Sequence, residues 1–256
     1  ADSLNATVLG PEAVPGTAEF DLFIKEVAKE MTIKAGQKCT AVRRIIVPEA
    51  QMEAVQDAVV QRLAGVRVGD PAQEGVRMGP LATELQGLRV REAAQVLARE
   101  NEVVFGAVDG GSDGAWFQPM LLRCAHPLEA NAAHRVEAFG PVATLMPYRD
   151  VAEAAKIAAL GGGSLVSSIV TADRDAAKEF VLEAGYSHGR VLVLDADLHG
   201  PSVEDYLGLP RRQGLTEILR GQLVIDQATR TTNIPGVSVI GAGQLPTNSS
   251  ELLGSD

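Results

Sequence analysis

The sequence predicts an α/β fold, in which a mainly parallel sheet is flanked by helices and is followed by a small C-terminal α/β fragment. Short apolar runs alternate with amphipathic segments of about ten residues or more, an order typical of βαβ units. Hydrophobic residues make up 46% of the 256 residues, so the chain can bury an ordinary core without disulfides.

The elements follow from the spacing of apolar residues. One stripe with a 3.6-residue period predicts a first helix that ends near Gly36. The β-branched run 45–47, closed by Pro48, is typical of a buried strand. Asp150 and Asp173 are expected to be helix N-caps. Further helices are expected over 52–63, over 85–98 and after these two Asp residues, and further strands over 102–105, 120–122, 142–145, 165–170 and 191–194.

The charge excludes two classes of partner. A formal net charge of −10 disfavours a nucleic-acid or anionic-membrane surface, because both require clustered Lys and Arg. No apolar run reaches the ~18 residues of a spanning helix, and no charged segment introduces an apolar leader. We therefore expect no nucleic-acid partner, no membrane span and a cytoplasmic location. The two cysteines are too few for a disulfide framework or a zinc site.

Cys39 is the candidate nucleophile. It follows the first helix and precedes a predicted buried strand, and its small neighbours would let a substrate carbonyl approach. Lys38 beside it would favour a thiolate. The alternative is that Cys39 is a small buried hydrophobic residue, which is commoner for a cysteine. Cys124 is expected to be structural.

Four motifs follow one another in order over residues 36–142. They are Gly-Gln-Lys-Cys-Thr at 36–40, Val-Gly-Asp-Pro at 68–71 leading to Gly-Pro-Leu at 79–81, Trp-Phe-Gln-Pro at 116–119, and Glu-Ala-Phe-Gly-Pro-Val at 137–142. In this respect the chain resembles the aldehyde dehydrogenase superfamily. Over about residues 1–195 it is most similar to the dehydrogenase part of bifunctional phenylacetate-degradation proteins, a likeness carried by residues 1–5 and 137–147.

The resemblance implies oxidation of a small-molecule aldehyde, a CoA-linked semialdehyde, to its acid with NADP or NAD as cofactor. It implies that Cys39 attacks the aldehyde to give a thiohemiacetal and then a thioester. Glu137 would hold the nicotinamide ribose hydroxyls, with Phe139 near the ring, and the Cys39 backbone N–H would be an oxyanion donor. Without the resemblance, Glu137 is a surface carboxylate before a turn and Phe139 is a core residue.

The same resemblance implies that part of an active enzyme lies upstream. In that family the dinucleotide-binding domain, the general-base glutamate and an oxyanion-hole asparagine precede the nucleophile, and the glutamate would fall immediately before Ala1. The isolated chain is therefore expected to be weak or inactive. An exposed face where the cofactor domain would pack is expected to favour a homo-oligomer.

A second constellation ends the predicted strand 191–194. Asp195 and Asp197 place two carboxylates at the carboxyl end of that strand, where parallel sheets bind ligands. Carboxylates spaced in this way can approach Mg²⁺ through water, which predicts a metal site. The alternative is a solvated turn or a helix cap.

From about residue 191 the sequence resembles bacterial tyrosine kinases of capsule and exopolysaccharide synthesis, which are relatives of P-loop ATPases. The likeness is carried by Asp195-Ala-Asp197-Leu and by stretches at 207–209, 214–215, 233–236 and 243–253. His199 and Gly200 stand where those kinases usually have arginines. No Gly-Lys pair of a P-loop occurs in the chain, so nucleotide hydrolysis is not expected.

Composition also changes at this point: residues 196–256 contain four Arg and no Lys. We therefore divide the chain into 1–195, a dehydrogenase-like catalytic domain, and 196–256, a kinase-like fragment. In the fragment, helices are expected over 215–219 and 222–228 and a strand over 237–240, docked loosely on the rest. Two competing hypotheses are a nucleotide-responsive regulatory fragment of a polysaccharide kinase system and an inert composite of the two parts.

Overall fold

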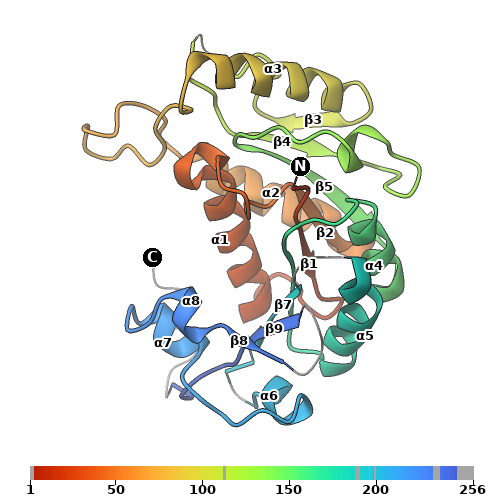
Figure 1. Cartoon of the computed structure of the whole chain (residues 1–256). Coiled ribbons are helices and arrows are strands. Elements are labelled where there is room, and N and C mark those ends of the chain that lie inside the picture. The colour runs from red at the N-terminus through yellow and green to blue at the C-terminus, as the bar shows by residue number, and fades with distance from the viewer. Residues whose placement is uncertain are drawn as a thin grey trace.

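The computed structural model, described over residues 3–111, 114–187, 191–195, 197–198, 200–232 and 237–246, contains one sheet of nine strands (Figure 1). The strands are β1 (Ala6–Leu9), β2 (Arg44–Pro48), β3 (Glu102–Phe105), β4 (Met120–Arg123), β5 (Val142–Tyr148), β6 (Ser167–Thr171), β7 (Val191–Asp195), β8 (Arg230–Thr231) and β9 (Val237–Ile240). Their order is β3-β4-β5-β2-β1-β6-β7-β9-β8. Only the edge strands β3 and β8 pair antiparallel with their neighbours, so the predicted mainly parallel sheet is confirmed.

Helices cover both faces of the sheet, as predicted. They are α1 (Ala18–Thr32), α2 (Met52–Ala64), α3 (Glu84–Ala98), α4 (Val151–Ala159), α5 (Arg174–Ala184), α6 (Val203–Tyr206), α7 (Leu215–Leu219) and α8 (Ile225–Ala228). One core cluster lies between the sheet and α1, α2, α7 and α8, and the other lies under α3, α4, α5 and α6. In β2, Ile45 and Val47 enter the first cluster and Ile46 the second. The strand is therefore buried on both faces, as a continuous apolar run predicts.

Local signals place the helix starts. The side chains of Asp150 and Asp173 accept hydrogen bonds from backbone N–H groups in the first turns of α4 and α5, which confirms both predicted N-caps. The strand β1 was not predicted from the sequence, although all four of its residues are buried at the centre of the sheet. The short elements α6 and β8 were not predicted either.

The C-terminal segment is not loosely docked, so that expectation was wrong. β9 pairs in parallel register with β7, from Val191 opposite Val237 to Leu194 opposite Ile240, and all four residues of β9 are buried. The reason is that β7 without β9 would present a row of unpaired backbone groups beside an apolar surface. The division at residue 195 remains a prediction. Of the kinase-like features, His199 and residues 233–236 and 247–253 lie outside the described residues.

Arg44 ties β2 to α4 through a network of buried hydrogen bonds. Its side chain has no exposed surface. The guanidinium donates to the carbonyl oxygens of Leu4, Ile157 and Ala158 at 2.7 to 2.9 Å and to Nδ1 of His134 at 3.1 Å. Nε2 of His134 lies 2.7 Å from the carbonyl oxygen of Pro127. Because a carbonyl only accepts and an arginine only donates, His134 is neutral with its hydrogen on Nε2.

This arrangement predicts loss of stability in mild acid. Burial lowers the pKa of His134; the hydrogen bond to the Pro127 carbonyl opposes this shift and the charge of Arg44 adds to it, so that the pKa is lowered on balance. Below about pH 6.5 the unfolded chain therefore binds a proton that the folded chain does not. The contribution of His134 to the free energy of unfolding is fully present above that pH. It is lost as the pH falls toward the folded-state pKa, by at most about 1.4 kcal/mol per pH unit. Urea denaturation at pH 7.5 and pH 5.5 measures this loss.

The matched variants are His134→Gln and, at an exposed position, His126→Gln. We expect H126Q to lose stability between the two pH values as the unmodified chain does. H134Q, which has no titratable group at that position, should lose less. An equal loss in all three proteins would show that His134 does not contribute to the pH dependence.

None of the helices within the described ranges is both long and apolar enough to cross a membrane.

Candidate active site

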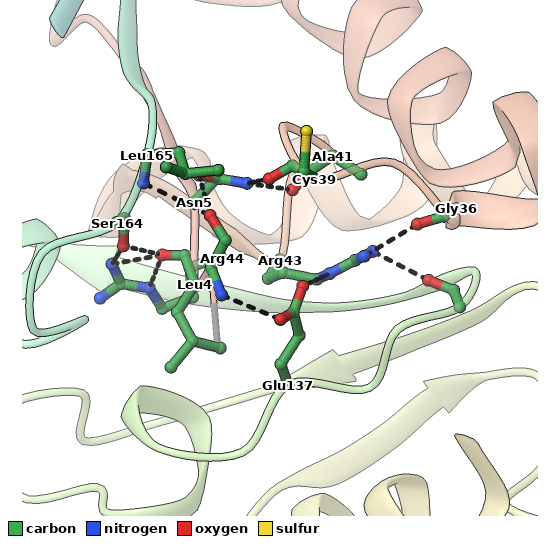
Figure 2. A network of polar contacts seen from close by, with 12 residues as sticks. Leu4, Asn5, Gly36, Cys39, Ala41, Arg43, Arg44, Glu137, Ser164 and Leu165 are labelled. Atoms are coloured by element: carbon green, nitrogen blue, oxygen red, sulfur yellow. Dashed lines mark hydrogen bonds and ion pairs between the residues drawn. The ribbon is translucent and has the colours of Figure 1, made fainter. Parts of the chain in front are cut away.

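Three segments meet at one edge of the sheet, each leading into a strand (Figure 2). Residues 3–5 precede β1, residues 36–43 precede β2, and residues 137–141 precede β5. Because β1 pairs with β2 and β2 pairs with β5, all in parallel, these segments are neighbours at the amino ends of the strands. Cys39, Glu137 and Phe139 therefore belong to one region, although they are far apart in the sequence.

Cys39 presents its thiol to solvent, since the residue is exposed. In Figure 2 its sulfur points away from Glu137 and Arg43. Lys38 does not serve the thiolate as expected, because its ammonium group donates to the carboxylate of Glu30 at 2.6 Å. Cys124, in contrast, is buried, and burial raises the pKa of its thiol. The two cysteines therefore differ in access to reagents, and only Cys39 is placed to meet a substrate.

Asn5 fixes the backbone around Cys39. Its Nδ2 donates to the carbonyl oxygens of Cys39 and Ala41, each at 2.9 Å. Its Oδ1 accepts from Ser3 Oγ at 2.7 Å and from the N–H of Val166 at 3.0 Å. This buried amide connects the Cys39 loop to β1 and to the segment before β6, so the loop is held while the thiol stays accessible. In the sequence, the feature that could have indicated this role of Asn5 is a single amide side chain at the start of a short apolar run.

Arg43 and Glu137 form a nearly buried ion pair beneath the loop. Nε of Arg43 donates to Oε1 of Glu137 at 3.2 Å, and the two side chains are 4% and 9% exposed. The other guanidinium nitrogens donate to the carbonyl oxygens of Gly36 at 2.8 Å and Gly140 at 2.9 Å. Oε2 of Glu137 accepts from the N–H of Ser3 at 2.9 Å. Burial lowers the pKa of Arg43, and Glu137 opposes that shift.

Arg43 thus joins the Cys39 segment to the Glu137 segment, a role that was not predicted from the sequence. Phe139, two residues after Glu137, is 36% exposed and is not the core residue of the alternative interpretation. The guanidinium carbon of Arg43 lies 5.4 Å from the centre of its ring, within the range of a cation–π contact. One residue therefore positions both members of the predicted cofactor-binding pair.

The backbone before Cys39 is strained. Lys34 and Ala35 both have φ of 52°, and Gly36 has φ of 69°. The left-handed conformation costs about 1–2 kcal/mol at a residue other than glycine. At Gly36 a side chain would also overlap the carbonyl group of Gly140. The hydrogen bond from Gln37 N–H to the Lys34 carbonyl, at 3.0 Å, helps hold this turn.

Lys34→Gly is therefore expected to raise the free energy of unfolding by up to about 1 kcal/mol, since Lys34 is exposed and glycine adopts this φ without the penalty. Chemical denaturation measures the change. The matched control is Lys25→Gly in the interior of α1, which should lower stability by about 1 kcal/mol. Destabilisation of both variants by the same amount would show that the turn is unstrained.

Asp195 and Asp197 lie at the opposite edge of the sheet, at the carboxyl end of β7. The Asp195 side chain is buried, and its carboxylate accepts from the N–H groups of Asp197, Ser202 and Val203 at 3.0 to 3.1 Å. Asp197 accepts from the N–H of Gly200 at 2.9 Å. Asp195 thus binds backbone N–H groups at the start of α6, whose N-cap residue is Ser202.

Among the residues that the structure describes, no group of three or more His, Cys, Asp or Glu side chains is placed to hold a metal ion. The magnesium site remains a prediction, and its two residues are not brought together with Cys39.

The sequence profile of the "Aldehyde dehydrogenase family" matches residues 9–198. The chain is 48% identical over 203 residues to "3,4-dehydroadipyl-CoA semialdehyde dehydrogenase" of Aromatoleum evansii, a match that covers 77% of this chain and 39% of that protein. Among solved structures, 1-pyrroline-5-carboxylate dehydrogenase from Thermus with bound NAD is similar, with a TM-score of 0.65 and 25% identity over 75% of this chain and 36% of that one.

The chain therefore spans about two fifths of the length of these dehydrogenases. A shorter stretch of 70 residues is 46% identical to "Tyrosine-protein kinase ptk" of Acinetobacter johnsonii and covers 27% of this chain but 10% of that protein. The profile match extends over most of the chain, including the loop of Cys39, the segment of Glu137 and β7. The chain belongs to the aldehyde dehydrogenase family.

Proposed function

We propose that this chain provides the nucleophile and the nicotinamide-side contacts for oxidation of a CoA-linked semialdehyde to its acid. The observation that carries the proposal is the exposed Cys39 thiol on a loop whose backbone is held by Asn5. The substrate class rests on the semialdehyde dehydrogenase of Aromatoleum evansii, to which the chain is 48% identical.

In the proposed reaction, the Cys39 thiolate attacks the aldehyde carbon, and a C–S bond forms as the carbonyl π bond opens. The backbone N–H of Cys39 donates a hydrogen bond to the resulting oxyanion of the thiohemiacetal. Oxidation leaves a thioester on Cys39, and attack by water releases the acid and returns the thiol. The hydrogen bonds from Asn5 to the Cys39 and Ala41 carbonyls keep the loop in one conformation through these steps.

The residues present fit the ribose and nicotinamide end of the cofactor, NAD or NADP. Glu137 offers carboxylate oxygens to ribose hydroxyls, and each oxygen accepts one hydrogen bond here and retains a further lone pair. Phe139 exposes part of its ring for packing. When bound, the nicotinamide supplies the hydride acceptor for the oxidation. Arg43 would hold Glu137 and Phe139 in place for this contact.

We also propose that the 256-residue chain turns over slowly by itself. Its matches cover 39% and 36% of the two dehydrogenases compared, and the resemblance places the base and the second oxyanion donor outside this stretch. Reaction at Cys39 should therefore be observable as a single covalent event when steady-state oxidation is weak.

Selective alkylation tests the nucleophile. With limiting iodoacetamide at pH 7.5, we expect Cys39 to be labelled at least about tenfold faster than Cys124, because Cys124 is buried and burial raises the pKa of its thiol. Mass spectrometry of the peptides gives both rates. Cys124→Ser should not change labelling at Cys39, and urea should abolish the difference. Equal labelling in the folded protein, or preferential labelling of Cys124, would contradict the proposal.

A second candidate, favoured by the 46% identity to the kinase over 70 residues, is a nucleotide-responsive fragment in which Asp195 and Asp197 approach Mg²⁺ through water. Against it, the Asp195 carboxylate already accepts three backbone N–H bonds. A thermal shift with Mg-ATP but not with NADP would favour this candidate, and a shift with NADP alone would favour the dehydrogenase. No shift with either would favour an inert composite.

A further inference from the structure

A groove lies over β7 and β9 on the face of the sheet that carries α5. The groove results from the connection between these strands. In the described part of that connection, α6, which has four residues, is the only helix on this face, and α7 and α8 pack on the other face. A full-length crossover helix would cover the two strands. The short helix leaves an open groove of about 130 Å³ between α5 and α6.

The walls of the groove are apolar. Ala177 and Val181 of α5 line one side, Val193 and Val237 of the two strands form the floor, and Leu207 after α6 lines the other side. Small-molecule sites are mostly apolar with a few placed polar groups. The groove is thus suited to a hydrocarbon body a few carbons long.

Cations stand at the rim. Arg174 and Lys178, one helical turn apart on α5, both line the groove and are exposed. Nζ of Lys178 lies 5.2 Å from the centre of the Tyr206 ring across the groove. Tyr206 and Asp175 raise the pKa of Lys178, so the ammonium stays charged. The positive charge of these two neighbouring side chains contrasts with the formal net charge of −10 of the whole chain.

The acidic neighbours do not neutralise both cations. Asp205, which acts on Arg174 electrostatically, is itself bound to Arg211 at 2.7 Å. Asp175 lies three residues before Lys178 on the same helix and is exposed. The rim therefore keeps an excess of positive charge above an apolar floor, which is the pattern that an amphipathic anion complements.

We propose that this groove binds a medium-chain carboxylate, with its hydrocarbon chain against Val181, Val193 and Val237 and its carboxylate between Arg174 and Lys178. The site lies over β7 and β9, whereas Cys39 precedes β2 at the amino edge of the sheet. It is independent of the proposed oxidation.

Isothermal titration of the whole chain with octanoate tests the proposal. We expect saturable binding of octanoate and about tenfold weaker binding of octanol, which has a similar chain and no charge. The double variant R174Q/K178Q should bind octanoate about as weakly as the unmodified chain binds octanol. The matched control K25Q/K29Q removes two charges from α1 on the opposite face and should bind octanoate normally.

A second variant tests the apolar part. Ala177→Leu fills the groove and should weaken the binding of both octanoate and octanol by about tenfold or more. Circular dichroism checks that the variant folds. The proposal is overturned if octanoate shows no saturable binding, if octanol binds as well as octanoate, or if R174Q/K178Q binds octanoate like the K25Q/K29Q control. It is also overturned if folded A177L binds octanoate unchanged.

Discussion

Arg44→Leu is expected to lower the free energy of unfolding by about 3–5 kcal/mol, a large part of the stability of an ordinary domain. The guanidinium has no exposed surface and donates to the carbonyl oxygens of Ile157 and Ala158 at the end of α4, each at 2.8 Å. Leucine fills part of the space but donates nothing, so these buried acceptors lose their partner. The helix end also loses the positive charge that its carbonyl groups favour.

The effect should exceed that of removing an arginine with similar bonds at the surface. Arg91 also donates to three backbone carbonyl oxygens, those of Asp109, Gly114 and Trp116, but it is only partly buried, and water can replace it. We expect Arg91→Leu to cost roughly 1–2 kcal/mol in urea denaturation. We expect the loss of stability in Arg44→Lys to lie between the losses in R44L and R91L, because the ammonium group of lysine still has three donors. If R44L and R91L lost the same free energy of unfolding, the buried hydrogen-bond network of Arg44 would not be the source of additional stability.

The sequence predicts most of the fold because local physical signals determine the elements. The stripe of apolar residues with a 3.6-residue period predicted α1, and the β-branched run before Pro48 predicted β2. The caps at Asp150 and Asp173 are set by side chains two or three residues away from the N–H groups they bind. β1 was missed because four residues between Asn5 and Gly10 are too few to show a period.

The contacts that build the site could not be predicted in the same way. Arg43 meets Glu137 across 94 residues and Asn5 meets Cys39 across 34, and such pairs leave no local pattern. Motifs identified Cys39 and Glu137, but not the side chains that hold them. Similarly, the apolar run of β9 predicts a strand and does not reveal that it continues the sheet beside β7.

These supporting contacts explain how one edge of the sheet can hold a reactive group steady. The strained turn at Lys34 and Ala35, the amide of Asn5 and the guanidinium of Arg43 all constrain the backbone on either side of Cys39. None of these side chains accepts from or donates to the sulfur in the described bonds. The thiol is therefore positioned through its backbone, and its reactivity can be tested without the cofactor.

Acylation by p-nitrophenyl acetate provides that test. An activated ester needs only attack by a thiolate and departure of p-nitrophenolate, so no hydride acceptor takes part. We expect a fast release of about one equivalent of p-nitrophenol per chain, followed by slow turnover as the Cys39 thioester hydrolyses. Cys39→Ala should lower the rate of the fast phase by about a hundredfold or more, because no other exposed thiol replaces it.

Cys124→Ala is the matched control and should keep the full burst, since Cys124 is buried. Mass spectrometry of the unmodified chain should place the added acetyl group on the peptide that contains Cys39. Asn5→Ala is expected to slow the burst without abolishing it, because the Cys39 and Ala41 carbonyls lose their donor and the loop gains conformations in which the thiol is not aligned. A burst that survives in C39A, or that disappears in folded C124A, would show that the reactive group lies elsewhere and would remove the nucleophile from the proposed function.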